Sequence, residues 1–160
     1  MQNKARRLEP ESLAGFWINR ASRSLVRHAD ARLRPLGFAL AYLPVLRALA
    51  GSQALSQKDL ANLARVEPPT MVETLARMER DGLIERQPNP DDKRGKLVSL
   101  TPRSRARFPK ARAALAAGER EAMAGLSDAE KTMLRSLLQR VVKNVEGSEP
   151  VPFLKTAPNQ

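Results

Sequence analysis

Apolar residues recur at intervals of three and four positions along most of this chain, which is the spacing of helices with one buried face. Proline and glycine interrupt the pattern and divide it into about six helices. Two stretches in the middle of the chain have the composition of short strands instead. The expected helices cover about residues 11–34, 40–50, 56–64, 68–81, 102–124 and 127–146, and the expected strands cover residues 83–86 and 97–100.

Residues 55–101 contain the most distinctive arrangement of these elements. Ser56 begins a weak capping box, S-x-x-D, at the start of one short helix, and residues 65–67 form the turn after it. Pro68 suits the first position of the next helix, where its missing N–H costs nothing. Gly82 is placed to end that helix in a left-handed conformation. Helix, tight turn, helix and two-stranded ribbon together predict a winged helix-turn-helix.

Other positions refine the boundaries of these elements. Residues 88–92 are rich in turn formers, and Gly95 offers a bend in the returning strand. Residues 54–55 are a candidate minimal strand. Pro44 leaves the start of the second helix open, and Pro109 predicts a kink or break in the fifth helix near Phe108.

The first and last helices carry more apolar surface than one small core needs. The last helix begins with a full capping box, formed by Ser127 and Glu130, and the helix before it begins at Thr101 and Pro102. Covering the core of its own domain explains part of the apolar face of the first helix, and a second chain would cover the rest. These apolar residues are Leu13, Phe16, Trp17, Leu25, Val26 and Leu33 in the first helix, and Met133, Leu134, Leu137, Leu138, Val141, Val142 and Val145 in the last.

The expected fold class is therefore mainly α (α+β), a winged helix-turn-helix with N- and C-terminal dimerisation helices. The expected organisation is a flexible arm at residues 1–10, a single domain at 11–146 and a tail at 147–160. Within the domain, residues 11–37 and 102–146 are the dimerisation helices, and residues 38–101 are the winged helix-turn-helix lobe.

The charge of the chain points to an anionic partner. The 160 residues carry a formal net charge of +11, and the isoelectric point is near 11.0. Such an excess favours nucleic acid over a membrane surface or acidic proteins. A high arginine content can also reflect a GC-rich coding sequence, but here the charge is concentrated in one module.

Several classes of protein are disfavoured by what the sequence lacks. Cysteine is absent, which excludes disulfides, cysteine-based zinc sites and thiol redox sensing, and a single histidine cannot build a multi-histidine metal site. Neither a secretory signal nor an apolar run of membrane-spanning length is visible, so the expected location is cytoplasmic. The glycine-rich and nucleophile signatures of common enzymes are also absent, so we expect no enzymatic activity, no cofactor and no metal.

The motifs in the second half of the lobe match a known family. They are M-x-R-D-G-L-I-E-R from Met78 onward, D-x-R at Asp92 and Arg94, and V-S-L-T at residues 98–101. With these motifs, the chain resembles the MarR family of bacterial transcriptional regulators. The resemblance implies a triangular homodimer in which terminal helices of two chains intertwine. It also implies a sequence-specific regulator of double-stranded DNA, most often a repressor that a small ligand releases.

The helix at residues 68–81 is the expected reader of the major groove. Burial of Met71, Leu75 and Met78 would leave one polar face outward. Glu73 departs from the family pattern, in which a basic residue is frequent. It either accepts a bond from cytosine or pairs with Arg77 four residues on, and the pairing is favoured. The candidate DNA contacts on this helix are Pro69, Thr70, Val72, Glu73, Thr74 and Arg77.

The ribbon is the expected second contact with DNA. By resemblance, Arg94 would enter the minor groove, and Asp92 would bond to it and fix its direction. A solvated, charged hairpin is the alternative. The remaining candidates are Lys93 and Lys96 in the ribbon, and Lys58, Arg65 and Arg86 as weaker phosphate contacts.

A ligand site is implied only by the resemblance. Relatives bind small aromatic or anionic effectors between the dimerisation layer and the DNA-binding lobe. The corresponding candidates are Trp17, Arg20, Ser24, His28 and Tyr42, each of which is also explained as an ordinary packing or surface residue.

Two hypotheses for the function follow. The first is a homodimeric regulator that binds a pseudo-palindromic operator, with half-site centres about 34–36 Å apart and with binding that weakens steeply as salt rises. The alternative is a winged-helix module that acts through protein contacts or coats DNA nonspecifically.

Overall fold

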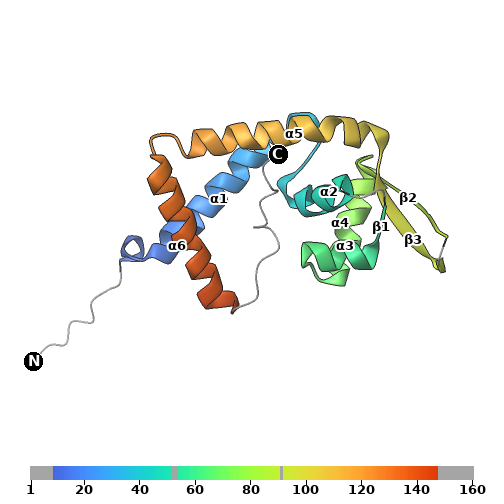
Figure 1. Cartoon of the computed structure of the whole chain (residues 1–160), viewed down its shortest axis with the longest axis horizontal. Coiled ribbons are helices and arrows are strands. Elements are labelled where there is room, and N and C mark those ends of the chain that lie inside the picture. Colours follow the sequence, from blue (N-terminus) through green and yellow to red (C-terminus); the bar gives the residue numbers. More distant parts are fainter. Residues whose placement is uncertain (1–8, 52–53, 91, 148–160) are drawn as a thin grey trace, which may run out of the picture. The chain divides into compact units, whose positions relative to one another are not determined.

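The computed structural model describes residues 9–51, 54–90 and 92–147, and of Lys93 and Arg94 only the backbone. The predicted arm and tail therefore lie almost entirely outside the described residues. The described part is mainly helical with one small antiparallel sheet (Figure 1). Its elements are η1 Pro10–Ser12, α1 Ala14–Leu33, η2 Arg34–Leu36, η3 Leu40–Tyr42, α2 Leu43–Ala50, β1 Leu55–Ser56, α3 Gln57–Ala64, α4 Pro68–Arg80, β2 Ile84–Asn89, β3 Asp92–Leu100, α5 Pro102–Ala122 and α6 Asp128–Glu146.

The chain separates into two compact units, and the division falls inside α5, between Gly118 and Glu119. The first unit contains the hydrophobic core. All buried apolar side chains among the described residues lie between Leu33 and Ala111, and the core joins the end of α1, α2, α3, α4, the sheet and the first half of α5. Phe38 and Phe108 meet edge-to-face in this core, with ring centroids 6.3 Å apart.

The sheet has the strand order β1-β3-β2, so β2 lies at its edge. Both strands of the ribbon are longer than the sequence predicts, because the expected turn at residues 88–92 is mostly paired. Pro88 pairs with Lys96, and Asn89 pairs with Asp92 after a shift in register. Proline is tolerated there because an edge strand need not donate every N–H to a neighbour. The resulting hairpin projects away from the helices of the lobe (Figure 1).

The local signals at the helix ends are confirmed. The Ser56 side chain accepts a bond from the Asp59 N–H at the start of α3. Pro68 is the first residue of α4, and Gly82 follows that helix with φ of +68°. Thr101 caps α5, because its Oγ1 accepts a bond from the Ser104 N–H at 3.2 Å.

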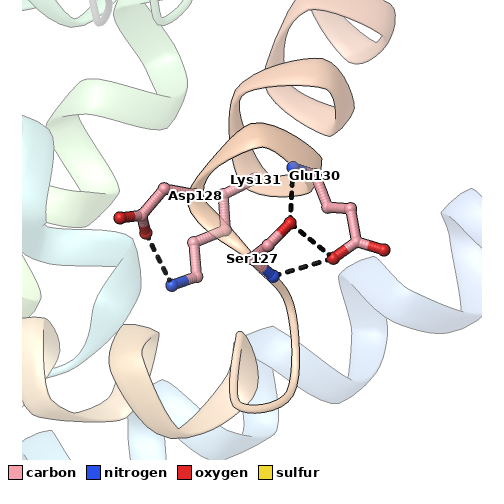
Figure 2. A network of polar contacts seen from close by, with 4 residues as sticks. All are labelled: Ser127, Asp128, Glu130 and Lys131. Carbon is pink, nitrogen blue, oxygen red and sulfur yellow. Dashed lines mark hydrogen bonds and ion pairs between the residues drawn. The ribbon is translucent and has the colours of Figure 1, made fainter.

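The full capping box of α6 is also present, as Figure 2 shows. The Ser127 N–H donates to the Glu130 carboxylate at 2.8 Å, and the Glu130 N–H donates to the Ser127 hydroxyl at 3.3 Å. The bonds from Ser127 lower the pKa of Glu130 from its ordinary value. An ion pair between Lys131 and Asp128 lies beside the box.

The structure resolves the start of the second helix, which the sequence left open. Residues 40–42 form a 3-10 turn, and α2 begins at Leu43, which places Pro44 in its first turn, where proline fits. The minimal strand is residues 55–56, one position later than expected. The helix α5 runs through Pro109 without a break, and Phe108 and Ala111 beside it are held in the core.

The first and last long helices leave apolar side chains uncovered. No residue of α6 is buried, and of the residues in α1 only Leu33 is buried. A helix with an apolar stripe is stable in water only where that stripe has a partner surface. The large apolar side chains that remain exposed on these helices are Trp17, Leu25, Val26, Met133, Leu134, Leu137, Leu138, Val141, Val142 and Val145.

No single helix in the described part is long and apolar enough to cross a membrane. One bent pair of segments, Ala14–Leu36 with Leu40–Ala50, passes that test by length and composition alone, with an angle of 84° between its halves. The second half of the pair contributes Val45, Leu46 and Leu49 to the core of the first unit.

Candidate nucleic-acid interface

The rotation of α4 about its axis is set by a buried stripe. Met71, Leu75 and Met78 are at most 1% exposed, and they anchor the helix to the core. This confirms the stripe predicted from the sequence and turns the other side of the helix outward. The predicted contacts Pro69, Thr70, Val72, Glu73 and Arg77 are exposed, and Thr74 is half-buried.

The turn before α4 is held by one residue in an unusual conformation. Arg65 has φ of +50°, and it is the only described residue other than glycine with a positive φ. Its N–H donates to the Asn62 carbonyl, and the Val66 N–H donates to the Ala61 carbonyl. These bonds close α3 and direct the chain into Pro68. Arg65 also takes part in a further interaction, so it is not without a partner in the free protein.

The first turn of α4 has few free N–H donors. Its first two residues are Pro68 and Pro69, which have no N–H, and the Met71 N–H is bonded to the Glu67 carbonyl. Thr70 is the only one of the first three residues of α4 that has an N–H, and this N–H has no bond among the described residues. The positive end of the helix dipole remains, but contact with a phosphate would depend mainly on side chains.

Glu73 and Arg77 do not form the pairing that was favoured from their spacing. Both side chains are exposed, and within the described part neither has a hydrogen bond or an ion pair. Four-residue spacing permits an ion pair on a helix, but such pairs contribute only about 0.3–0.5 kcal/mol and are readily left open to solvent. Arg77 therefore shares an open flank of α4 with Thr70 and Thr74, which lie seven and three residues before it.

The other end of α4 is tied to the chain segment before α2. The Tyr42 hydroxyl donates to the Asp81 carboxylate at 3.0 Å, and the Arg80 guanidinium pairs with the same residue at 3.2 Å. Burial of Tyr42, and then its bond to Asp81, raise the pKa of the phenol above its ordinary value. This contact agrees with the packing explanation for Tyr42, which was also a candidate ligand residue.

Arg86 connects three elements of the lobe. Its Nε donates to the Glu79 carboxylate at 2.9 Å, and its Nη1 donates to the Gln57 side chain at 3.5 Å. The side chain of Arg86 is only 20% exposed. These bonds attach β2 to α4 and α3, so the guanidinium that was a weaker candidate for phosphate contact is occupied inside the lobe.

The ribbon places its charges near the turn between β2 and β3. Asp92 and Lys96 are exposed, whereas the side chains of Lys93 and Arg94 lie outside the described part, so the predicted bond between Asp92 and Arg94 stays a prediction. Gly95 has a specific role here, because a Cβ at this position would lie 2.8 Å from the Asp92 carboxylate. Lys58 is exposed on α3.

The candidate ligand residues on α1 have separate partners. The Trp17 indole donates to the Glu11 carbonyl at 2.9 Å, and the Arg20 guanidinium lies over the Trp17 ring at 5.5 Å. Ser24 accepts a bond from Arg27 at 3.2 Å.

His28 is held in a packing contact between α1 and α5. Its Nε2 donates to the Gly118 carbonyl at 3.2 Å, and its Nδ1 accepts from Arg32 at 3.1 Å. A Cβ at position 118 would lie 2.9 Å from Arg32, so glycine allows the two helices to approach. This arrangement favours the packing explanation for His28 over the ligand explanation.

Comparison with known proteins agrees with this geometry. A family model described as MarR family matches residues 41–96 of the chain. A probable transcriptional regulator from Pseudomonas aeruginosa is 30% identical, with a TM-score of 0.72 and with 82% of this chain and 98% of that chain covered. The chain belongs to the MarR family. It is therefore a winged-helix transcriptional regulator, and membership in a family of regulators supports the expectation that it is not an enzyme.

Two further relatives extend the similarity of this MarR-family chain. A mutant form of MarR from Escherichia coli, solved in complex with operator DNA, is 27% identical with a TM-score of 0.72, and the match covers 84% of this chain and 98% of that chain. An uncharacterized HTH-type transcriptional regulator of Bacillus subtilis, YwoH, is 29% identical over 122 residues, which is 76% of this chain and 88% of YwoH.

The bond between Tyr42 and Asp81 yields a prediction about stability. Replacement of Tyr42 by Phe removes a largely buried hydrogen bond to a carboxylate, so the free energy of unfolding should fall by about 1–2 kcal/mol. Because the folded state raises the pKa of the phenol, this contribution is present below the ordinary pKa of tyrosine and is lost as pH rises through the raised value.

Urea denaturation at neutral pH measures this change. Lys58→Gln serves as the control for a substitution at an exposed position of the lobe, and it should leave the free energy of unfolding nearly unchanged. An unfolding free energy equal to that of the wild type in Tyr42→Phe would show that the bond to Asp81 does not hold the end of α4.

Proposed function

We propose that this chain is a homodimeric repressor that binds a pseudo-palindromic operator in double-stranded DNA. The observation that supports the proposal best is the open flank of α4, a helix that the core holds in place. On this flank Thr70 and Arg77 are exposed, Thr74 is half-buried, and Arg77 has no ion pair among the described residues. The similarity to MarR of E. coli, which was solved with operator DNA, supports the same partner. A net charge of +11 favours a polyanion.

In this proposal, α4 is the recognition helix and enters the major groove. Arg77 can bond to guanine or to a phosphate, and Thr70 can reach either. Val72 is 46% exposed on the opposite flank, where it can contact a thymine methyl group. Glu73, with no cation to neutralise it in the free protein, would accept from a cytosine amino group or repel incorrect sites.

The hairpin of β2 and β3 provides the second contact. Arg94 would insert into the adjacent minor groove, whose narrow form has an enhanced negative potential. Asp92, Lys93 and Lys96 stand beside it in β3. Arg86 would act indirectly, because its bonds to Glu79 and Gln57 fix the angle between the hairpin and the recognition helix.

The homodimer is proposed to cover the apolar faces of α1 and α6. Leu134 and Leu138 are each 38% exposed, and Met133 is 60% exposed. Apolar side chains in this number on one helix are typical of an interface with a second chain. A dimer places two recognition helices in successive major grooves, so the half-site centres should be about 34–36 Å apart.

We also propose that a small-molecule effector releases the DNA and that the protein works in the cytoplasm. The effector is inferred from relatives in the MarR family, which bind small aromatic or anionic ligands. The occupied side chains of Tyr42 and His28 argue against their direct use in its site. The cytoplasm is where a bacterial regulator meets its operator.

Variants of α4 and the hairpin test the DNA contacts. Arg77→Ala and Arg94→Ala should each weaken operator binding about tenfold or more, because each removes a contact with a base edge or a groove. Arg80→Ala, at the far end of α4, is the matched control for loss of one positive charge. Fluorescence anisotropy with a duplex that the wild type selects from a random pool measures the affinities.

The outcomes separate the two hypotheses. If Arg80→Ala weakens binding as much as Arg77→Ala and Arg94→Ala, net charge alone drives association, and the module coats DNA nonspecifically. If the two test variants bind like the wild type, the recognition helix and the hairpin are wrongly assigned.

Variants of α6 test the dimer. The double variant Leu134→Glu, Leu138→Glu places two charges on the exposed apolar stripe and should convert the dimer to a monomer, as light scattering after size-exclusion chromatography measures. Arg135→Glu with Gln139→Glu is the control, because it adds two carboxylates on the polar side of the same helix. A mass of two chains in both double variants would contradict the role assigned to α6.

A further inference from the structure

A small cavity lies within the first unit, at the junction of three segments of the chain. One segment follows α1, the second ends the recognition helix, and the third is the beginning of α5. The cavity has a volume of about 260 Å³. It is lined by Arg34, Pro35, Gly37, Phe38, Asp81, Gly82, Leu83, Arg103, Ser104 and Arg107, and none of the candidate ligand residues from the sequence is among them.

Three guanidinium groups line this cavity without acidic partners. The side chains of Arg34, Arg103 and Arg107 form no hydrogen bond or ion pair with any residue in the described part of the chain. The one carboxylate in the lining belongs to Asp81, and it is already bonded to Tyr42 at 3.0 Å and to Arg80 at 3.2 Å. The cavity therefore has an excess of positive charge.

Gly37 lies in contact with one of these cations. It has φ of +76°, and a Cβ at this position would lie 3.5 Å from a terminal nitrogen of Arg107. The guanidinium of Arg107 thus lies against the backbone of the segment after α1. Phe38, next along the chain, is 4% exposed and fixes this segment in the core. Arg107 is the cation with the most restricted position in the cavity, since Arg34 and Arg103 are exposed.

Ser104 is an independent indication of a ligand. It is 1% exposed, and its hydroxyl is the only buried side-chain polar atom without a hydrogen-bond partner among the described residues. An unsatisfied buried hydroxyl is unfavourable, so such a group needs an explanation. It lies in the first turn of α5, a helix of 21 residues, where the helix dipole favours a negative charge.

We propose that this cavity is a binding site for a small anion that carries a carboxylate or a phosphate group. The Ser104 hydroxyl would donate to an oxygen of the anion, Arg107 would pair with it from the side of Gly37, and Arg34 and Arg103 would supply the surrounding positive charge. A volume of about 260 Å³ is below the roughly 300 Å³ at which pockets for drug-sized ligands begin, so the ligand is small.

The position of the site gives the ligand a direct contact with the end of the recognition helix. Asp81 and Gly82 immediately follow α4, and the Gly82 carbonyl accepts a bond from the Thr101 hydroxyl, which caps α5. The anion would therefore lie between the recognition helix and the first turn of α5. The proposal does not depend on DNA binding, because the free protein contains the whole site.

Calorimetric titration of the full chain without DNA tests the site. Inorganic phosphate and benzoate are the two probes, at an ionic strength held constant with sodium chloride, and they distinguish a phosphate group from a carboxylate. The wild type should bind at least one of them. Arg107→Gln should bind that probe at least tenfold more weakly, and the control Arg105→Gln, an exposed neighbour outside the cavity lining, should bind it like the wild type.

A second variant separates binding from folding. Ser104→Ala should weaken binding of the same probe several-fold and should raise the melting temperature of the unliganded protein, because it removes the unsatisfied hydroxyl. The proposal is overturned if the wild type binds neither probe, or if Arg107→Gln and Arg105→Gln bind equally well. It is also overturned if Ser104→Ala binds like the wild type.

Discussion

Burial of Met71, Leu75 and Met78 fixes the orientation of α4 about its axis. This orientation decides which residues of the helix lie on the outer surface of the lobe. The three side chains occupy one face of the helix and are almost fully removed from water. Removal of this much apolar surface from water outweighs any single polar contact on the outer face. The open flank with Thr70 and Arg77 is a consequence of this packing.

The two ends of α4 are fixed by different means. At its start, Arg65 adopts a left-handed conformation, and Pro68 begins the helix three residues later, so this end is fixed by neighbouring residues in the sequence. At its end, the carboxylate of Asp81 is held by Tyr42, 39 residues earlier in the chain. Arg86 then ties the hairpin to the same helix through Glu79. The hairpin is therefore bonded directly to α4, and the cavity proposed to bind an anion lies at the end where this helix meets α5.

The fold could be predicted where the signal is local. Three helix-end signals act within four residues of the chain: the proline at the start of α4, the glycine after this helix and the capping box at Ser127. Such local signals can be read from the sequence alone. Strand ends were missed because pairing across the ribbon continued through residues with turn-forming composition. The bonds from Tyr42 to Asp81 and from Arg86 to Glu79 were missed because they depend on tertiary packing. For the same reason, the unpartnered hydroxyl of Ser104 has no signature in the sequence.

Selection of bound sequences from a random duplex pool by the full chain tests the central claim most directly. A dimeric reader built on α4 and the hairpin predicts enrichment of an inverted repeat whose half-site centres are about one helical turn apart, roughly 10–10.5 base pairs. Enrichment of no sequence over the starting pool, or of a single unrepeated half-site, would contradict it.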